Sequence, residues 1–172
     1  MIVYKILSAL LEYPDQELLN ALPDIRTALE QEQAISEIEQ STVEKFLSVL
    51  ETNRLIELQA DYVQTFDLTP EHSLHLTHHL FGEEKGRGPA LIDLSEYYKD
   101  YGLESDDGEL PDYLPMILEF AAQLEDAEAH IFLSQMVKVL DQLAINLEKA
   151  NSPYAPLIRI IESRGRLSRI AA

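Results

Sequence analysis

The sequence predicts an all-α, single-domain helical bundle formed by residues 1–172. Apolar residues recur at spacings of three and four along most of the chain, which is typical of helices that pack one face onto a core. No segment of useful length alternates apolar and polar residues as a strand does, and only six glycines are spread over the chain. A chain of 172 residues is long enough to bury one core, so we expect one domain.

The first part of the chain predicts two helices and a polar connection. Apolar residues of segment 2–11 share one helical face, and Pro14 ends this helix because proline disfavours helical dihedrals at the residue before it. Asp15 can cap a second helix, which Pro23 should kink or break. Residues 30–41 are polar and weakly periodic, which indicates a frayed helix end or a surface connection.

A long helix is expected next. Ser41 and Glu44 have the spacing of a capping box, in which each side chain bonds the backbone of the other residue. Helical apolar spacing then continues from Val43 to Phe66, which predicts one uninterrupted helix.

Two shorter helices follow, and proline and glycine mark their ends. Pro70 after Thr69 predicts a helix over residues 70–81. Pro89 predicts a second helix, which Gly102 ends because glycine adopts the left-handed conformation that closes helices.

Residues 103–112 predict a hinge-like linker. They carry five acidic residues, a glycine and a proline without periodicity. Asp112 can cap a following helix that runs through Leu124. A hinge here would let two copies exchange their second helical portions, so a monomer and a domain-swapped dimer both remain open.

The last part of the chain predicts the longest helix and a loose end. Strong periodicity over residues 127–149 predicts one helix, and Ser152 with Pro153 begins another. From about residue 163 the chain holds three arginines and no acidic residue, and we expect this tail to be loosely held.

Composition narrows the possible partners and location. The 31 acidic and 13 basic residues give a formal net charge of −18, which repels nucleic acid and anionic membranes and attracts cationic partners. No apolar stretch approaches the ~20 residues of a membrane-spanning helix, and residues 1–16 lack the features of an export signal. We therefore expect a cytoplasmic protein without direct membrane insertion. The absence of cysteine excludes disulfides and thiolate chemistry.

The histidines offer the one candidate for a metal site. His72, His75 and His79 would share one side of the predicted helix 70–81, and this geometry suits zinc. A helical metal-binding sensor is therefore the alternative function. However, metal sites usually recruit ligands from more than one element, and no Glu-x-x-His or His-Glu-x-x-His pattern occurs. The prediction is no metal ligand, no cofactor, no catalytic residue and no enzyme.

A different pattern suggests a binding surface. Aromatic and apolar residues on predicted helices stand close to carboxylates, a combination that suits a cationic amphipathic peptide. The alternative, that the rings are simply core and the acids are helix caps, stays open. The residues concerned are Tyr62, Phe66, Leu76, Tyr97, Tyr113 and Phe120, with Asp61, Asp67, Asp93, Asp112 and Glu119.

Five segments between residues 4 and 124 carry a resemblance to a known family. They read LSALLEYPDQEL, LQADYVQTFDL, SLHL, GRGPALIDLSEYYKDYGL and ELPDYLPMILEFAAQL, in this order. Together they resemble the nitrate reductase molybdenum cofactor assembly chaperones of the NarJ type, within the TorD-like redox enzyme maturation chaperones. The resemblance implies an all-helical cytoplasmic chaperone without catalytic activity. Its partner would be the N-terminal segment of a molybdoenzyme catalytic subunit, held until the cofactor is inserted and the complex assembled.

The resemblance also implies a peptide groove. Tyr113 stands where family members commonly have histidine, in the segment LPDYLP. Combined with the neighbouring acids and rings, the predicted peptide-binding set is Tyr62, Phe66, Asp67, His75, Leu76, Leu110, Pro111, Asp112, Tyr113, Pro115 and Glu119.

Overall fold

The computed structural model describes residues 1–81, 85–103 and 108–170, with side chains up to residue 166. These residues form helices and turns and contain no β-strand, which confirms the all-α prediction. The helices are α1 (Ile2–Leu11), α2 (Gln16–Gln31), α3 (Glu37–Thr52), α4 (Leu55–Tyr62), α5 (Leu76–Phe81), α6 (Arg87–Asp100), α7 (Leu114–Ala121), α8 (Asp126–Ser134), α9 (Val137–Lys149) and α10 (Ala155–Ile170). None of these helices is long and apolar enough to cross a bilayer.

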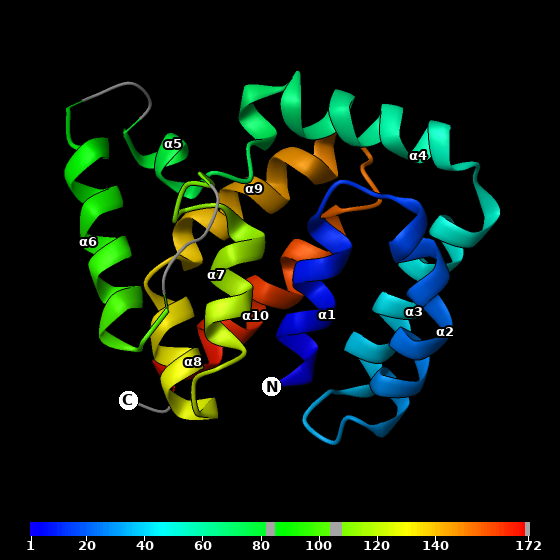
Figure 1. Ribbon diagram of the computed structural model, residues 1–172, viewed down its shortest axis with the longest axis horizontal. Helices are drawn as coiled ribbons and strands as arrows, with labels where there is room; N and C mark the ends of the chain where they lie inside the picture. The colour runs from blue at the N-terminus through cyan, green and yellow to red at the C-terminus, as the bar shows by residue number, and fades with distance from the viewer. Residues whose placement is uncertain (82–84, 104–107, 171–172) are drawn as a thin grey trace.

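Helix α1 lies at the centre of the molecule beside α7, with α10 behind them (Figure 1). The pair α2 and α3 lies at one end of the bundle, α6 lies at the other, and α4 crosses the top. Tyr4, Leu7, Leu10 and Leu11 of α1 are fully buried, and they belong to a core to which nearly every helix contributes. Burial of one such side chain stabilises the fold by ~1.5–3 kcal/mol. Ser8 ties the two central helices together by donating to the Pro115 carbonyl at 2.7 Å.

The predicted first helix and its successor are confirmed, but Pro23 does not break the second helix and the predicted capping box of the third is wrong. Asp15 caps α2 by accepting from the Leu18 amide at 2.8 Å. Pro23 lies inside α2 without breaking it, because it is on the exposed side, where water can satisfy the carbonyl that proline leaves unpaired. The capping box of the next helix is Ser36 with Glu39, not Ser41 with Glu44.

The predicted uninterrupted helix from Val43 to Phe66 is wrong. Asn53 and Arg54 adopt extended dihedrals between α3 and α4. The Asn53 side chain donates to the Val49 carbonyl at 2.8 Å, and Glu57 accepts from the Arg54 backbone, so each side of the break is capped locally. After α4, a π-helical turn over residues 63–67 ends the segment.

The predicted helix 70–81 is also wrong. Pro70–His72 form a single 3₁₀ turn, and the chain is then extended until α5 begins at Leu76. His75 pairs antiparallel with Tyr113, through bonds from the Leu76 amide to the Asp112 carbonyl and from the Leu114 amide to the Leu74 carbonyl. This pairing with a remote segment replaces the helical bonds that the local sequence favours.

The linker and the next helix need correction too. Residues 104–107 lie outside the described residues, so the hinge is not tested there. Pro111 is buried and Asp112 is fully buried, so the end of the predicted linker is packed against the bundle. Asp112 does not cap the helix that follows it, because α7 begins only at Leu114, after Tyr113.

The predictions for the last helices are confirmed only in part. The predicted helix 127–149 is divided between Ser134 and Val137, where α10 packs against both halves. Residues 163–166 belong to α10, and the guanidinium of Arg164 donates to Glu39 at 2.7 Å in a largely buried pair. The predicted loose tail therefore does not begin at residue 163.

Replacing Gly165 by alanine is expected to destabilise the fold, although alanine normally favours helices. A Cβ at this position would lie 2.7 Å from Cγ2 of Val137 and 2.9 Å from the Leu133 carbonyl oxygen. Overpacking of this kind costs about 1–3 kcal/mol, more than the gain in helix propensity. Chemical denaturation should show a lower free energy of unfolding for Gly165→Ala. The control Gly88→Ala, where a Cβ would meet nothing within 4 Å, should be neutral or stabilising.

Candidate functional site

Three adjoining hollows form one groove, which follows the seam between α1 and α7 and continues past the C-terminal end of α1. The first, of about 300 Å³, is lined by Tyr13, Tyr62, Phe66, Asp67, Ser73, Leu74, His75, Glu109 and Tyr113. The second, of about 380 Å³, is lined by Glu12, Tyr13, Glu109, Tyr113, Met116 and Glu119. The third, of about 410 Å³, is lined by Lys5, Ala9, Glu12, Glu119 and Gln123. Each hollow shares residues with the next, so we call the whole the α1–α7 groove and its first hollow the aromatic chamber.

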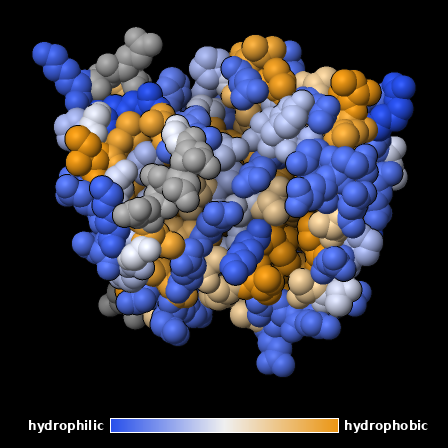
Figure 2. Space-filling view, in the orientation of Figure 1, coloured by the Kyte–Doolittle hydropathy of each residue, from blue (hydrophilic) through white to orange (hydrophobic). Residues whose placement is uncertain are grey.

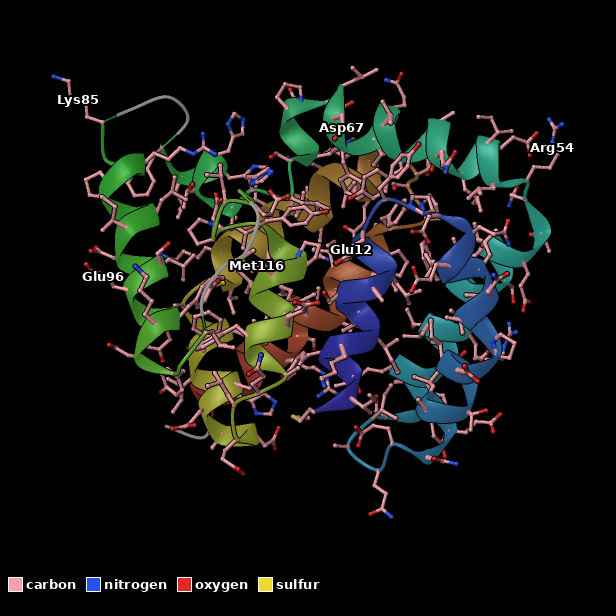
Figure 3. The ribbon with its side chains drawn as sticks, in the orientation of Figure 1. Glu12, Arg54, Asp67, Lys85, Glu96 and Met116 are labelled. Atoms are coloured by element: carbon pink, nitrogen blue, oxygen red, sulfur yellow. The ribbon has the colours of Figure 1, made fainter. Side chains whose placement is uncertain are left out.

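The groove opens on the face shown in the figures. Glu12, directly after α1, and Met116 on α7 lie beside each other at its centre, and Asp67 lies above them at the end of the π turn (Figure 3). Figure 2 shows this face covered largely by hydrophilic side chains, with small hydrophobic patches between them. A surface of this composition suits an amphipathic partner better than a purely apolar one.

Tyr62 is the centre of the aromatic chamber. Its hydroxyl donates to the Leu11 carbonyl at 2.8 Å and lies 3.1 Å from the Tyr113 hydroxyl. Since the single Tyr62 proton is used on Leu11, Tyr113 donates to Tyr62. The rings of Tyr13 and Phe66 lie 5.7 and 4.8 Å from the Tyr62 ring, centroid to centroid, within the range of favourable aromatic pairs. Burial raises the pKa values of Tyr62 and Tyr113, so both remain neutral hydroxyls.

Asp112 lies behind the chamber and holds its wall. One carboxylate oxygen accepts from the backbone amide and the hydroxyl of Thr77, and the other lies 3.3 Å from Nδ1 of His75. Burial opposes ionisation, but the bonds from His75 and Thr77 prevail and lower the pKa of Asp112. The His75 ring then stacks on Tyr113, with centroids 5.2 Å apart. A buried carboxylate thus sets the position of a surface ring.

Carboxylates follow the whole length of the groove. Asp67 and Glu109 lie at the aromatic chamber, and Glu12 and Glu119 lie below it. The pKa of Glu12 is raised by burial and by repulsion from Glu119, Asp15 and Glu109. Among the described residues, the one lysine or arginine that lines the groove is Lys5, in the third hollow. The groove therefore has a negative potential that a cationic ligand would relieve.

Glu12→Gln is expected to raise the free energy of unfolding at neutral pH. The pKa of Glu12 is raised in the folded state, so ionisation above about pH 4.3, the ordinary pKa of glutamate, opposes folding. Although Glu12 is partly buried, more than a third of it remains accessible to solvent, and solvent screening keeps the gain below about 1 kcal/mol. Urea denaturation at two pH values checks this prediction. The gain should vanish below about pH 4, and Glu30→Gln, an exposed site on α2, should show none.

The structure brings six of the predicted site residues to the groove and leaves five outside its lining. The lining contains Tyr62, Phe66, Asp67, His75, Tyr113 and Glu119. Leu76, Pro111, Asp112 and Pro115 are buried and do not line it, and Leu110 is exposed but outside it.

The sequence predictions missed the residues that α1 and the two positions after it contribute. Glu12 and Tyr13 line the two upper hollows, and Lys5 and Ala9 line the lowest. A signal exists for them, because Lys5, Ala9 and Glu12 follow one another at helical spacing and none has a large apolar side chain. Tyr13, beside the helix-ending Pro14, is 49% exposed.

The histidines do not form the face on which the metal-sensor alternative depended. His72 lies in the 3₁₀ turn, His75 in the extended segment and His79 in α5. Their rings contact different partners: the Thr65 carbonyl at 3.0 Å, Asp112 at 3.3 Å and the Ser73 carbonyl at 2.6 Å, respectively. Within the described ranges, no group of three or more His, Cys, Asp or Glu residues could hold a metal ion. The alternative has no support.

The fold and the groove define an all-helical bundle with an open, acidic and aromatic groove on one face. Residues 14–159 match the family model described as "Nitrate reductase delta subunit". The chain therefore belongs to the nitrate reductase delta subunit family.

Individual relatives agree with this membership. The nitrate reductase molybdenum cofactor assembly chaperone NarJ of Escherichia coli (strain K12) is 35% identical over 161 residues, which are 94% of this chain and 68% of that protein. The probable assembly chaperone NarJ of Bacillus subtilis (strain 168) is 37% identical over 163 residues, covering 93% and 86%. The probable assembly chaperone NarW of E. coli (strain K12) is 31% identical over 157 residues, covering 91% and 65%. These matches confirm the resemblance stated from the sequence.

Proposed function

We propose that this protein is a cytoplasmic assembly chaperone of a nitrate reductase. It holds the N-terminal segment of the molybdoenzyme catalytic subunit in the α1–α7 groove and supports insertion of the molybdenum cofactor. Membership of the nitrate reductase delta subunit family, and relatives named as molybdenum cofactor assembly chaperones, support this role. We propose that the protein binds its client without catalysing a reaction.

The observation that carries the proposal is the composition of the groove. Four carboxylates surround a surface of tyrosine, phenylalanine and methionine side chains. Basic side chains of a peptide would pair with the carboxylates, and its apolar side chains would pack on the rings. Helices α1 and α7 form the walls of its lower part, so an amphipathic helix can lie between them along its apolar face.

A titration tests the proposal. The probe is a synthetic peptide of about 15 residues, four helical turns, that copies the N-terminus of the nitrate reductase catalytic subunit encoded in the same genome. Isothermal titration calorimetry should show binding that weakens between low and high salt, because salt screens charges at a surface groove. Absence of binding at both salt concentrations would contradict the proposal.

A pair of variants isolates the groove. Glu119→Gln removes one lining carboxylate and should weaken peptide binding by up to about fivefold, the range of exposed charge pairs. Glu30→Gln removes a carboxylate from the exposed face of α2 and leaves the groove intact. Equal weakening by both variants would show that net charge, rather than the groove, attracts the peptide.

A further inference from the structure

The two ends of the α1–α7 groove differ in charge and in chemistry. The upper end is the aromatic chamber, where Asp67 and Glu109 lie beside tyrosine rings. The lower end is lined by Lys5, Ala9 and Gln123, together with the carboxylates that it shares with the middle hollow. A groove with unlike ends distinguishes the two directions in which a peptide can lie.

We propose that the bound segment lies with its amino-terminal end in the aromatic chamber and its carboxyl-terminal end at Lys5. This inference rests on the proposed function and adds a direction to it. It assigns Tyr13, Asp67 and Glu109 to recognition of a cationic amino end, and Lys5 to recognition of the opposite end.

The aromatic chamber suits the amino end because that end carries the most positive charge. An α-amino group, a basic side chain near it and the amino-terminal end of a helix dipole are all positive. Asp67 and Glu109 supply the opposite charge, and the half-exposed ring of Tyr13 supplies a face for a cation. None of the ion pairs formed by the described residues uses Asp67, and Glu109 faces only His75, at 3.8 Å.

Lys5 suits the carboxyl end for the converse reason. The last carbonyls of a helix are unpaired and carry partial negative charge, and lysine ammonium groups interact favourably with them. Lys5 is exposed, and no ion pair of the described residues includes it. Its ammonium group is therefore available to a ligand.

The dimensions agree with a helical ligand that spans both ends. Lys5 lies six residues before Leu11, where α1 ends, and Tyr13 follows the end of the helix. The part of α1 between them is therefore about 9 Å long, or nearly two turns of a bound helix. The small side chain of Ala9 lies between them and lets a second helix come close, and Met116 supplies apolar contact from α7.

The absence of cysteine makes the direction measurable. Leu68→Cys places a single thiol beside the aromatic chamber, and Glu125→Cys places one near the lower end; both native residues are exposed and neither lines the groove. Each thiol is labelled with an energy-transfer acceptor. The client peptide described above carries the donor at its amino end or at its carboxyl end.

The expected result is a crossed pattern. The amino-end donor should transfer more efficiently to position 68, and the carboxyl-end donor more efficiently to position 125. The reversed pattern, or equal transfer to both positions, would overturn the direction, while calorimetric binding of the labelled proteins would leave the proposed function standing. Failure of the peptide to bind would instead reject the proposed function, and the direction with it.

A charge test checks the lower end independently. The same peptide with a free carboxyl terminus should bind about threefold more tightly than its amide, because Lys5 favours the carboxylate. Lys5→Glu should abolish or invert this preference, and Lys45→Glu on the exposed face of α3 should keep it. A preference that survives in Lys5→Glu would contradict the assignment of Lys5.

Discussion

Replacing Asp112 by alanine is expected to lower the free energy of unfolding by about 3 kcal/mol, the cost of removing one member of a buried polar network. The carboxylate accepts two hydrogen bonds from Thr77 and faces His75, with no exposure to solvent. Its loss leaves the amide at the start of α5 without a partner. Thermal denaturation should show a decrease in Tm of about 6–12 °C for a chain of this size.

Two further variants define the origin of that loss. Asp112→Asn keeps a carbonyl oxygen for the Thr77 bonds and removes the charge near His75 and Arg87, so it should lose less stability than alanine. Asp24→Ala, at an exposed position of α2, should change Tm little. If Asp112→Ala were as stable as Asp24→Ala, Asp112 would not hold the chamber wall.

The pH dependence of the unfolding free energy of these variants follows from the direction in which the pKa of Asp112 is shifted. The pKa of Asp112 is lowered in the folded state, so its stabilisation is present above the ordinary aspartate value of about 3.9. This stabilisation is lost as the pH falls through the lowered pKa. The difference in unfolding free energy between the wild type and Asp112→Asn should therefore be constant at neutral pH and shrink only below about pH 4.

The part of the fold that the sequence predicted depends on local physics. Pro14 and Gly102 mark helix ends because each restricts or permits backbone dihedrals in its own neighbourhood, and Asp15 caps α2 by accepting from an amide three residues along the chain. The predicted all-α class required only that apolar residues recur at helical spacing. None of these inferences needs knowledge of which elements touch.

The predictions that failed depend on partners far away in the sequence. Asp112 precedes a helix and therefore looks like a local cap, yet it caps α5 at Thr77, 35 residues earlier. The pairing of His75 with Tyr113 breaks the predicted helix 70–81 in the same way. The periodicity of apolar residues carries no information about such partners, because it depends only on neighbouring residues. The hydrogen bonds that compete with the helical ones come from distant segments of the chain.

In the groove, too, the residues close together in the sequence were predicted and those brought together by distant contacts were not. Tyr62, Phe66 and Asp67 lie near one another in the sequence, and the combination of rings and acid was recognisable. Glu12 meets Glu119 only because α1 and α7 pack side by side, more than 100 residues apart in the chain. Sequence reasoning thus found the chamber wall from α4 and the π turn, but not the contribution of α1.

Replacing Tyr113 by alanine is expected to weaken peptide binding about 30-fold, the effect of removing a central aromatic contact worth about 2 kcal/mol. The Tyr113 ring lines both the aromatic chamber and the middle hollow, stacks on His75 and donates its hydroxyl to Tyr62. Alanine removes the wall that separates bound apolar side chains from water. Calorimetry with the client peptide, well below the Tm of the variant, measures the loss.

Two control variants complete the test. One separates the contribution of the Tyr113 ring from that of its hydroxyl, and the other shows whether removing any exposed tyrosine weakens binding. Tyr113→Phe keeps the ring and loses only the hydrogen bond to the Tyr62 hydroxyl. The affinity for the peptide should therefore fall by no more than about fivefold, the effect of one neutral hydrogen bond. Tyr101→Ala, at a half-exposed ring directly after α6 and outside the groove, should bind as the wild type does. Wild-type affinity in Tyr113→Ala would place the peptide elsewhere on the protein. A loss in Tyr113→Phe equal to that in alanine would assign the effect to the hydroxyl, and hence to the ordering of Tyr62 rather than to contact with the ring.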